Sequence, residues 1–259
     1  MSEFVLAKVE IDETAATIGA DREFIGPAVE AMKAARRDIE RQIRRDRFFL
    51  TTIEPYDPPS DSSRVVRRMC DAARAAGVGP MAAVAGAVAQ EALEAMVASG
   101  LRHGWVDNGG DIALMAGEKV VVEILCEPGR TDALGLEIEP TGGIIGICTS
   151  SGRLGHSISF GDADAAVAIA ADAVLADALA TAIGNRAVDG ESLSRCFEGF
   201  RGLAGFRAGM VIRDEKVAVC GDLPRIVAVE HSPERVTVHS KMSSSSYFGH
   251  TVRPAEVIQ

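Results

Sequence analysis

Residues 81–99 read MAAVAGAVAQEALEAMVAS, an alanine-rich stretch in which larger apolar side chains recur between small ones. A helix that is apolar around most of its circumference is buried, and small side chains let it lie close to a sheet or to another helix. The stretch therefore predicts a buried core helix. Its larger apolar residues are Val84, Val88, Leu93, Met96 and Val97.

A second alanine-rich stretch predicts a helix over residues 163–183, with Asp162 as its N-cap and Gly184 at its end. Residues 82–89, AAVAGAVA, are echoed by residues 165–172, AAVAIAAD. Alanine bias alone also produces such an echo. We treat residues 1–259 as a single domain, and an internal duplication of two α+β halves remains a hypothesis.

Short strand candidates surround these helices, separated by glycine-rich or polar turns. They cover residues 111–116, 119–125, 134–138, 144–148 and 156–160, and then 208–212, 217–220, 226–229 and 236–240. A further helix is predicted over residues 192–200, and residues 243–246 are expected to be mobile. Neighbouring short strands favour an antiparallel sheet, so the predicted class is α+β, with an antiparallel sheet and buried helices.

The N-terminal part predicts a hairpin followed by two helices. Residues 4–11 and 15–19 contain strand formers, Gly26-Pro27 suits a helix start, and residues 29–43 show helical apolar spacing. The arginines of this helix form either an anion site or a solvated face paired with Glu30, Asp38 and Glu40, and we favour the solvated face. Residues 56–63, YDPPSDSS, predict a loop that leads into a helix over residues 64–76, which Gly77 ends.

Composition limits the possible partners and the compartment. The chain has 259 residues, 27 basic against 37 acidic, and a formal net charge of -10. This charge disfavours nucleic acid or an anionic membrane as the main partner. The N-terminus lacks the apolar region of a signal peptide, so a cytoplasmic location is expected. Five scattered cysteines, with no Cys-x-x-Cys, predict reduced thiols.

Three segments place small or polar groups where a ligand could approach. In the first, Asn108-Gly109 is typical of a tight hairpin turn. The functional alternative is that Gly109 and Gly110 let backbone N–H groups reach a phosphate or a ring carbonyl, while Asp107 or Asp111 orients the ligand. The sequence leaves both interpretations open.

The second segment contains Thr149, Ser150, Ser151 and Gly152, followed by His156. Small hydroxyl groups beside glycine can bind an anion, and a histidine can accept a proton from an attacking hydroxyl at neutral pH. A lone histidine beside a strand is more often structural. No Gly-x-Ser-x-Gly surrounds a serine here, which disfavours a hydrolase triad.

The third segment is residues 175–184, LADALATAIG. Asp177 and Thr181 are four residues apart and therefore share one helix face, where a carboxylate and a hydroxyl offer hard oxygen ligands to Mg²⁺. In the alternative interpretation, Thr181 bonds back to the helix and Asp177 faces solvent. An aspartate in so apolar a helix favours a function, because burial of an unpaired carboxylate is unfavourable.

The order of these motifs resembles the ApbE superfamily of flavin transferases. Asn108-Gly-Gly-Asp111, Thr149-Ser-Ser-Gly152, His156 and residues 176–182, ADALATA, match the series Asn-x-Gly-Gly-Asp, Thr-Ser-Gly, His and Ala-Asp-Ala-x-x-Thr-Ala. Residues 77–86, GVGPMAAVAG, and residues 148–160 are closer to an uncharacterised bacterial and archaeal subfamily.

The resemblance implies a tandem T-fold-like, two-layer scaffold and Mg²⁺-dependent transfer of FMN from FAD to a protein threonine or serine, with release of AMP. It implies that Asp177 and Thr181 hold Mg²⁺ and that His156 is the catalytic base. The flavin nucleotide would contact residues of the first two segments, namely Asn108, Gly109, Gly110, Asp111, Thr149, Ser150, Ser151 and Gly152.

The chain also departs from the superfamily. His156 is followed by Ser-Ile-Ser-Phe-Gly-Asp-Ala instead of a sequence with Asp-Pro, and Val84-Ala85-Gly86 stands in place of the usual Lys-Gly. Transferase activity and FAD pyrophosphate cleavage both stay open. The subfamily implies an alternative, a non-catalytic accessory protein of sulfide assimilation or homocysteine biosynthesis. A binder of another nucleotide or a pterin-like ring is a further alternative, by analogy of fold alone.

Overall fold

The computed structural model describes residues 3–124, 132–150, 161–188, 192–214, 216–230 and 252–254. Their larger sheet has eight strands in the order β1-β2-β3-β4-β7-β8-β9-β10, and neighbouring strands are antiparallel. Its strands are β1 (Phe4–Ile11), β2 (Thr14–Asp21), β3 (Gly104–Asp107), β4 (Asp111–Met115), β7 (Ile145–Ser150), β8 (Ala165–Ala170), β9 (Phe206–Arg213) and β10 (Lys216–Gly221).

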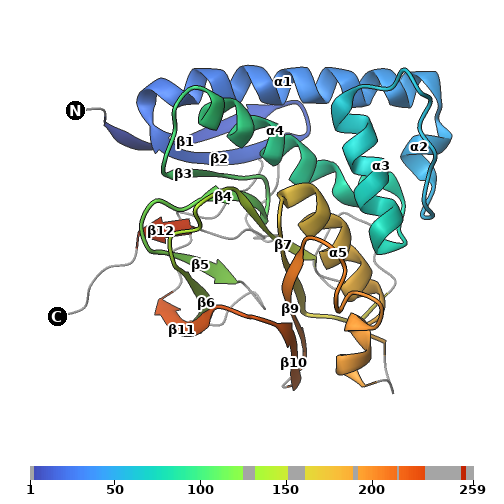
Figure 1. The fold of residues 1–259 in the computed structure, drawn as a ribbon, viewed down its shortest axis with the longest axis vertical. Coiled ribbons are helices and arrows are strands. Elements are labelled where there is room, and N and C mark those ends of the chain that lie inside the picture. Colours follow the sequence, from blue (N-terminus) through green and yellow to red (C-terminus); the bar gives the residue numbers. More distant parts are fainter. Residues whose placement is uncertain are drawn as a thin grey trace.

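A smaller antiparallel sheet has the strand order β11-β6-β5-β12. It packs on one face of the larger sheet, and the two share a core that includes Leu136 of one sheet and Ile147 of the other (Figure 1). Its strands are β5 (Val120–Ile124), β6 (Asp132–Ile138), β11 (Arg225–Glu230) and β12 (Val252–Pro254).

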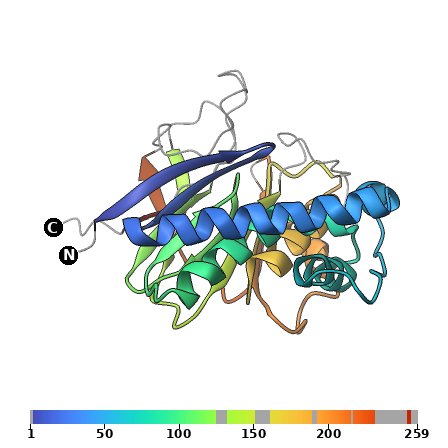
Figure 2. The ribbon, with the colours of Figure 1, turned by 90° about the horizontal axis from the view of Figure 1, so that it is seen from above.

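The helices cover the opposite face of the larger sheet. The long helix α1 crosses over α4, while α4 and α5 lie against the strands (Figures 1 and 2). The α+β class is confirmed, and the smaller sheet adds a third layer to the two that were expected. The helices are α1 (Arg22–Arg45), α2 (Phe48–Thr51), α3 (Arg64–Ala76), α4 (Val84–Ala98) and α5 (Ala173–Asn185), with 3₁₀ turns η1 (Pro80–Ala83) and η2 (Leu193–Phe197).

Residues 163–183 do not form one helix, as the sequence suggested. Residues 165–170 form β8, and α5 begins only at Ala173, with Asp172 as its N-cap in place of Asp162. Along β8, Ala166 and Ala168 face the helices while alternate residues face the smaller sheet. Tertiary packing thus overrides the helix propensity of alanine. The echo between residues 82–89 and 165–172 therefore compares a helix with a strand.

Other boundaries were predicted with mixed success. The N-terminal hairpin and α3 are confirmed, but α1 begins at Arg22, so Pro27 lies inside the helix. The helix expected over residues 192–200 is only the short turn η2. Strand β3 was not predicted. The strands expected over residues 156–160 and 236–240, and the mobile residues 243–246, lie outside the described residues.

The arginines of α1 form a paired surface, as favoured from the sequence. Arg41 pairs with Asp38, and Arg44 pairs with Glu40. Arg36 reaches across to the hairpin and donates hydrogen bonds to Glu13 and Thr14. The exposed pairs of Arg41 and Arg44 contribute little stability each. Glu30 pairs with Lys33 instead of an arginine.

One helical stretch, Pro80–Ala98, is long and apolar enough to cross a membrane by length and composition. Half of its apolar window is buried inside the protein. The helix α4 packs against α1, α5 and β4. Core packing accounts for its apolar character.

Replacement of Gly146 by alanine is expected to destabilise the fold. A Cβ atom there would lie 2.3 Å from the Asp172 carbonyl oxygen and 2.4 Å from the Ala173 Cα, so β7 and the start of α5 would have to separate. We expect a loss of about 1–3 kcal/mol in the free energy of unfolding by urea titration. Gly143→Ala is the matched control, since nothing lies within 4 Å of its added Cβ. Equal stability of both variants would contradict this packing.

Candidate functional site

The β3–β4 hairpin turn lies at the centre of the candidate site. Gly109 and Gly110 are its central residues, with φ angles of 71° and 104°, a region that favours glycine. The Asn108 N–H donates to the Asp111 carbonyl over 3.1 Å, and the Gly110 N–H donates to Asp107 Oδ1 over 2.9 Å. The tight-turn interpretation is confirmed, with Gly109-Gly110 and not Asn108-Gly109 as the central pair.

This turn is held from two sides. Asn108 Nδ2 donates to the carbonyl of Ala85, at the start of α4, over 3.0 Å. On the other side, the Thr149 N–H of β7 donates to the Gly110 carbonyl over 3.2 Å. The turn therefore connects the end of β7 with the N-terminus of α4.

Asp177 does not face solvent, which excludes one of the two interpretations offered by the sequence. Its side chain is buried, and its Oδ2 accepts the Gly86 N–H over 2.9 Å. The first N–H groups of a helix have no partner within the helix, and they carry partial positive charge. Asp177 of α5 thus caps the N-terminus of α4.

Close contact between these helices requires glycine at position 86. A Cβ atom on Gly86 would lie 2.2 Å from the Ala173 carbonyl oxygen and 2.8 Å from the Cβ of Asp177. Residues Val84-Ala85-Gly86 form the start of α4. The small residues let α4 and α5 meet at Asp177.

Asp111 lies beside Asp177, and the pKa of each carboxyl is raised above its usual range. Burial raises the pKa of Asp177 to about 7, although the N–H groups of Gly86 and Ala85 oppose this shift. Burial, followed by the nearby Asp177 carboxylate, raises the pKa of Asp111 well above its usual range. Within the described residues, Asp111 Oδ1 is buried without a hydrogen-bond partner. Such an oxygen is suited to a ligand or a cation.

Cys148 belongs to the same cluster, a role the sequence did not reveal. Its Sγ lies 3.4 Å from the Ala173 carbonyl oxygen. Burial and the carboxylates of Asp111 and Asp177 raise the pKa of the Cys148 thiol well above its usual range. The thiol therefore stays protonated and is a poor nucleophile. Cys126 lies outside the described residues.

The remaining predicted residues divide into three groups. Ser150 lies on the helix-facing side of β7, near Gly184 of α5, and Thr181 is partly exposed one turn after Asp177. Thr149 alternates to the opposite face of β7, so its backbone and not its side chain meets the turn. Ser151, Gly152 and His156 lie outside the described residues.

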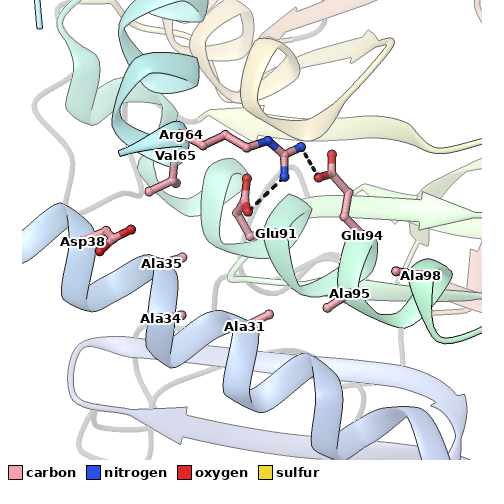
Figure 3. A pocket seen from close by; sticks show the side chains of 10 residues that line it. All are labelled: Ala31, Ala34, Ala35, Asp38, Arg64, Val65, Glu91, Glu94, Ala95 and Ala98. Atoms are coloured by element: carbon pink, nitrogen blue, oxygen red, sulfur yellow. Dashed lines mark hydrogen bonds and ion pairs between the residues drawn. The ribbon is translucent and has the colours of Figure 1, made fainter. Parts of the chain in front are cut away.

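Across the described ranges, no three histidine, cysteine, aspartate or glutamate side chains form a ready metal cluster. A hollow of about 460 Å³ lies elsewhere, between α1, α3 and α4 (Figure 3). It contains none of the predicted site residues. Its lining residues are Ala31, Ala34, Ala35, Asp38, Arg64, Val65, Glu91, Glu94, Ala95 and Ala98.

The arrangement of strands and helices is that of the ApbE proteins. The flavin transferase ApbE from Vibrio cholerae aligns with a TM-score of 0.55 and 14% identity, over 85% of this chain and 97% of that chain. The ApbE protein from Thermotoga maritima aligns with a TM-score of 0.54 and 13% identity, over 85% and 97% of the two chains. At such identity the likeness shows a shared fold.

Comparison of sequences identifies the family of the chain. The family model described as "AbpE bacteria" matches residues 3–196, and the chain belongs to this family. The UPF0280 protein of Methanocella arvoryzae is 46% identical over 231 residues, covering 89% of this chain and 94% of that protein. The UPF0280 protein of Archaeoglobus fulgidus is 41% identical over 235 residues, covering 89% and 97%.

The buried acids predict an unusual pH dependence of stability. Unfolded aspartates titrate at ~3.9, while Asp177 in the folded protein has a pKa of about 7. The folded state therefore binds more protons between these values, and this contribution to the free energy of unfolding falls as the pH rises from about 4 to about 7. Asp111, whose pKa is also raised, adds to the overall fall. Asp111→Asn removes this second contribution, so we expect the variant to show a shallower fall and to be more stable than the parent at pH 8, on the order of 1–3 kcal/mol.

Thermal unfolding from pH 4 to pH 8 measures this effect. Asp61→Asn serves as the control, because the Arg45 hydrogen bond lowers the pKa of the exposed Asp61 carboxyl, so its removal gives no gain at pH 8. An Asp111→Asn protein less stable than the parent at pH 8, with an unchanged pH profile, would refute the assignment.

Proposed function

We propose that this protein binds FAD together with Mg²⁺ at the site formed by Asp111, Asp177 and the Asn108–Asp111 turn. One observation carries the proposal. Within the described residues, Asp111 Oδ1 is buried without a hydrogen-bond partner, and the carboxyl lies beside the buried Asp177 in a fold shared with flavin transferases. Strongly shifted carboxyls of this kind are typical of functional sites.

The donor set fits Mg²⁺. This ion prefers oxygen ligands, keeps several waters and needs only one or two carboxylates together with substrate phosphates. Asp111, Asp177 and Thr181 would supply the protein oxygens. When bound, Mg²⁺ would neutralise charge on the FAD pyrophosphate.

The turn suits the ligand. Gly109 is exposed, and nothing lies within 4 Å of the position of its absent Cβ, so a phosphate or a flavin ring could approach the backbone. Asn108 is committed to Ala85, so its proposed role is to hold the turn in place. We further propose that the nucleotide contacts Thr149, Ser150, Ser151 and Gly152. For Ser151 and Gly152 this proposal rests on the sequence alone.

The proposed reaction transfers FMN to a threonine or serine hydroxyl of an acceptor protein. The acceptor oxygen forms a bond to the FMN phosphorus, the pyrophosphate P–O bond breaks, and AMP leaves. His156 would take the hydroxyl proton. With water as the acceptor, the same site would cleave the FAD pyrophosphate. A cytoplasmic location is proposed for both outcomes.

Calorimetric titration with FAD, with and without Mg²⁺, tests the proposal, with AMP release followed in parallel. We expect Mg²⁺-dependent binding that falls at least about tenfold in Asp177→Asn, because the variant keeps the shape but loses the charge of a cation ligand. Asp71→Asn, on the exposed surface of α3, should bind like the parent. Absence of FAD binding in the parent would overturn the proposal and favour the accessory role.

A further inference from the structure

Helices α4 and α5 are joined by two matched hydrogen bonds. The Gly86 N–H of α4 donates to Asp177 Oδ2 of α5, and the Ala173 N–H of α5 donates to Gln90 Oε1 of α4, each over 2.9 Å. Gly86 and Gln90 are four residues apart on α4, and Ala173 and Asp177 are four residues apart on α5. The two residues of each helix therefore lie on the same face of that helix. The two bonds fix how far one helix can slide along the other.

Gln90 is itself held by charged neighbours. Its Nε2 donates to Glu94 Oε1 over 2.9 Å, and Arg68 Nη1 donates to the same oxygen over 2.9 Å. Arg68 also reaches Asp172, the N-cap of α5, over 3.4 Å. The side chains of Gln90, Glu94, Arg68 and Asp172 are therefore linked in sequence, and the Gln90 bond to Ala173 closes the circuit at the start of α5. This group is called the α3–α5 ring below.

We infer that Gln90 is a positioning residue for Asp177. The residue lies on the buried side of α4, and a buried amide with both ends bonded has one orientation. Its bond to Ala173 satisfies an N–H group at the start of α5 that has no partner within the helix. This bond sets the register of α5 on α4, which brings Asp177 opposite the Gly86 N–H.

The α3–α5 ring has an exposed outer side that provides a control. In the hollow of Figure 3, Arg64 bridges Glu91 and Glu94 from solvent, and its side chain is 61% exposed. When this exposed bridge is lost, Arg68 and Gln90 still donate hydrogen bonds to Glu94. Arg64→Gln should therefore leave the register of α5 unchanged.

Amide hydrogen exchange of Gly86, followed by NMR, reports the register directly. In Gln90→Met, which keeps the volume but removes the acceptor, we expect the Gly86 amide to exchange about tenfold faster relative to Val167 in β8. The exchanged pair Gln90→Glu with Glu94→Gln should restore protection, since the carboxylate introduced at position 90 accepts the Ala173 N–H and the amide introduced at position 94 donates back to it. Arg64→Gln should match the parent.

Two results would overturn the inference. One is unchanged Gly86 protection in Gln90→Met; the other is an increase no larger than that of Val167, which would mean general destabilisation. If Gln90→Met fails to fold, Gln90→Asn replaces it, because the asparagine side chain is too short to reach the Ala173 N–H. The effect on Mg²⁺ and FAD binding rests on the proposed function. If the parent binds neither, that proposal fails while the exchange data still decide the role of Gln90.

Discussion

The site depends on how closely the start of α5 is enclosed. Ala173 lies between Gly86 of α4 and Gly146 of β7, and a Cβ atom on either glycine would collide with its backbone. Interiors packed this tightly have few alternative arrangements, so a helix enclosed on both sides has a defined position. The alanines of α4, α5 and β8 serve the same end, because they keep the layers close. Asp177 is placed one turn further along α5, where its carboxylate meets the N-terminus of α4.

The same enclosure creates the electrostatic character of the site. Asp177 is buried and Asp111 is partly buried. Burial raises the pKa of both carboxyls, the neighbouring Asp177 and Asp107 raise that of Asp111 further, and backbone N–H groups and the Cys148 thiol act in the opposite direction. Among the described residues, no cationic side chain contributes to these shifts. A carboxylate in such surroundings is disfavoured unless a proton or a cation neutralises it. By contrast, Glu91 and Glu94 of the hollow between α1, α3 and α4 are paired with Arg64 and Arg68. The two acidic regions therefore differ in chemistry.

Local sequence signals predicted an element correctly where turn and cap residues mark both of its ends. The bounds of α3 followed from the turn residues before it and from Gly77, which adopts a left-handed conformation. The same reasoning failed at β8, where alanine favours a helix and only contact with both neighbouring layers selects a strand. In the site, the order of the motifs along the chain was enough to select Asn108, Asp111 and Asp177 as candidates. Their bonds to Ala85 and Gly86, like that of Gln90 to Ala173, join distant positions whose register no local pattern encodes.

Likeness of fold does not choose among the candidate functions, because the ApbE structures share only 13–14% identity with this chain. The energetics of Asp111 are more informative. A purely structural hairpin could carry asparagine at that position and so avoid an ionisable group with a strongly raised pKa. Proteins keep locally unfavourable groups mainly where ligands or reactions use them. An accessory protein without ligand chemistry would not need this carboxyl, whereas a protein that binds a cation and phosphates would.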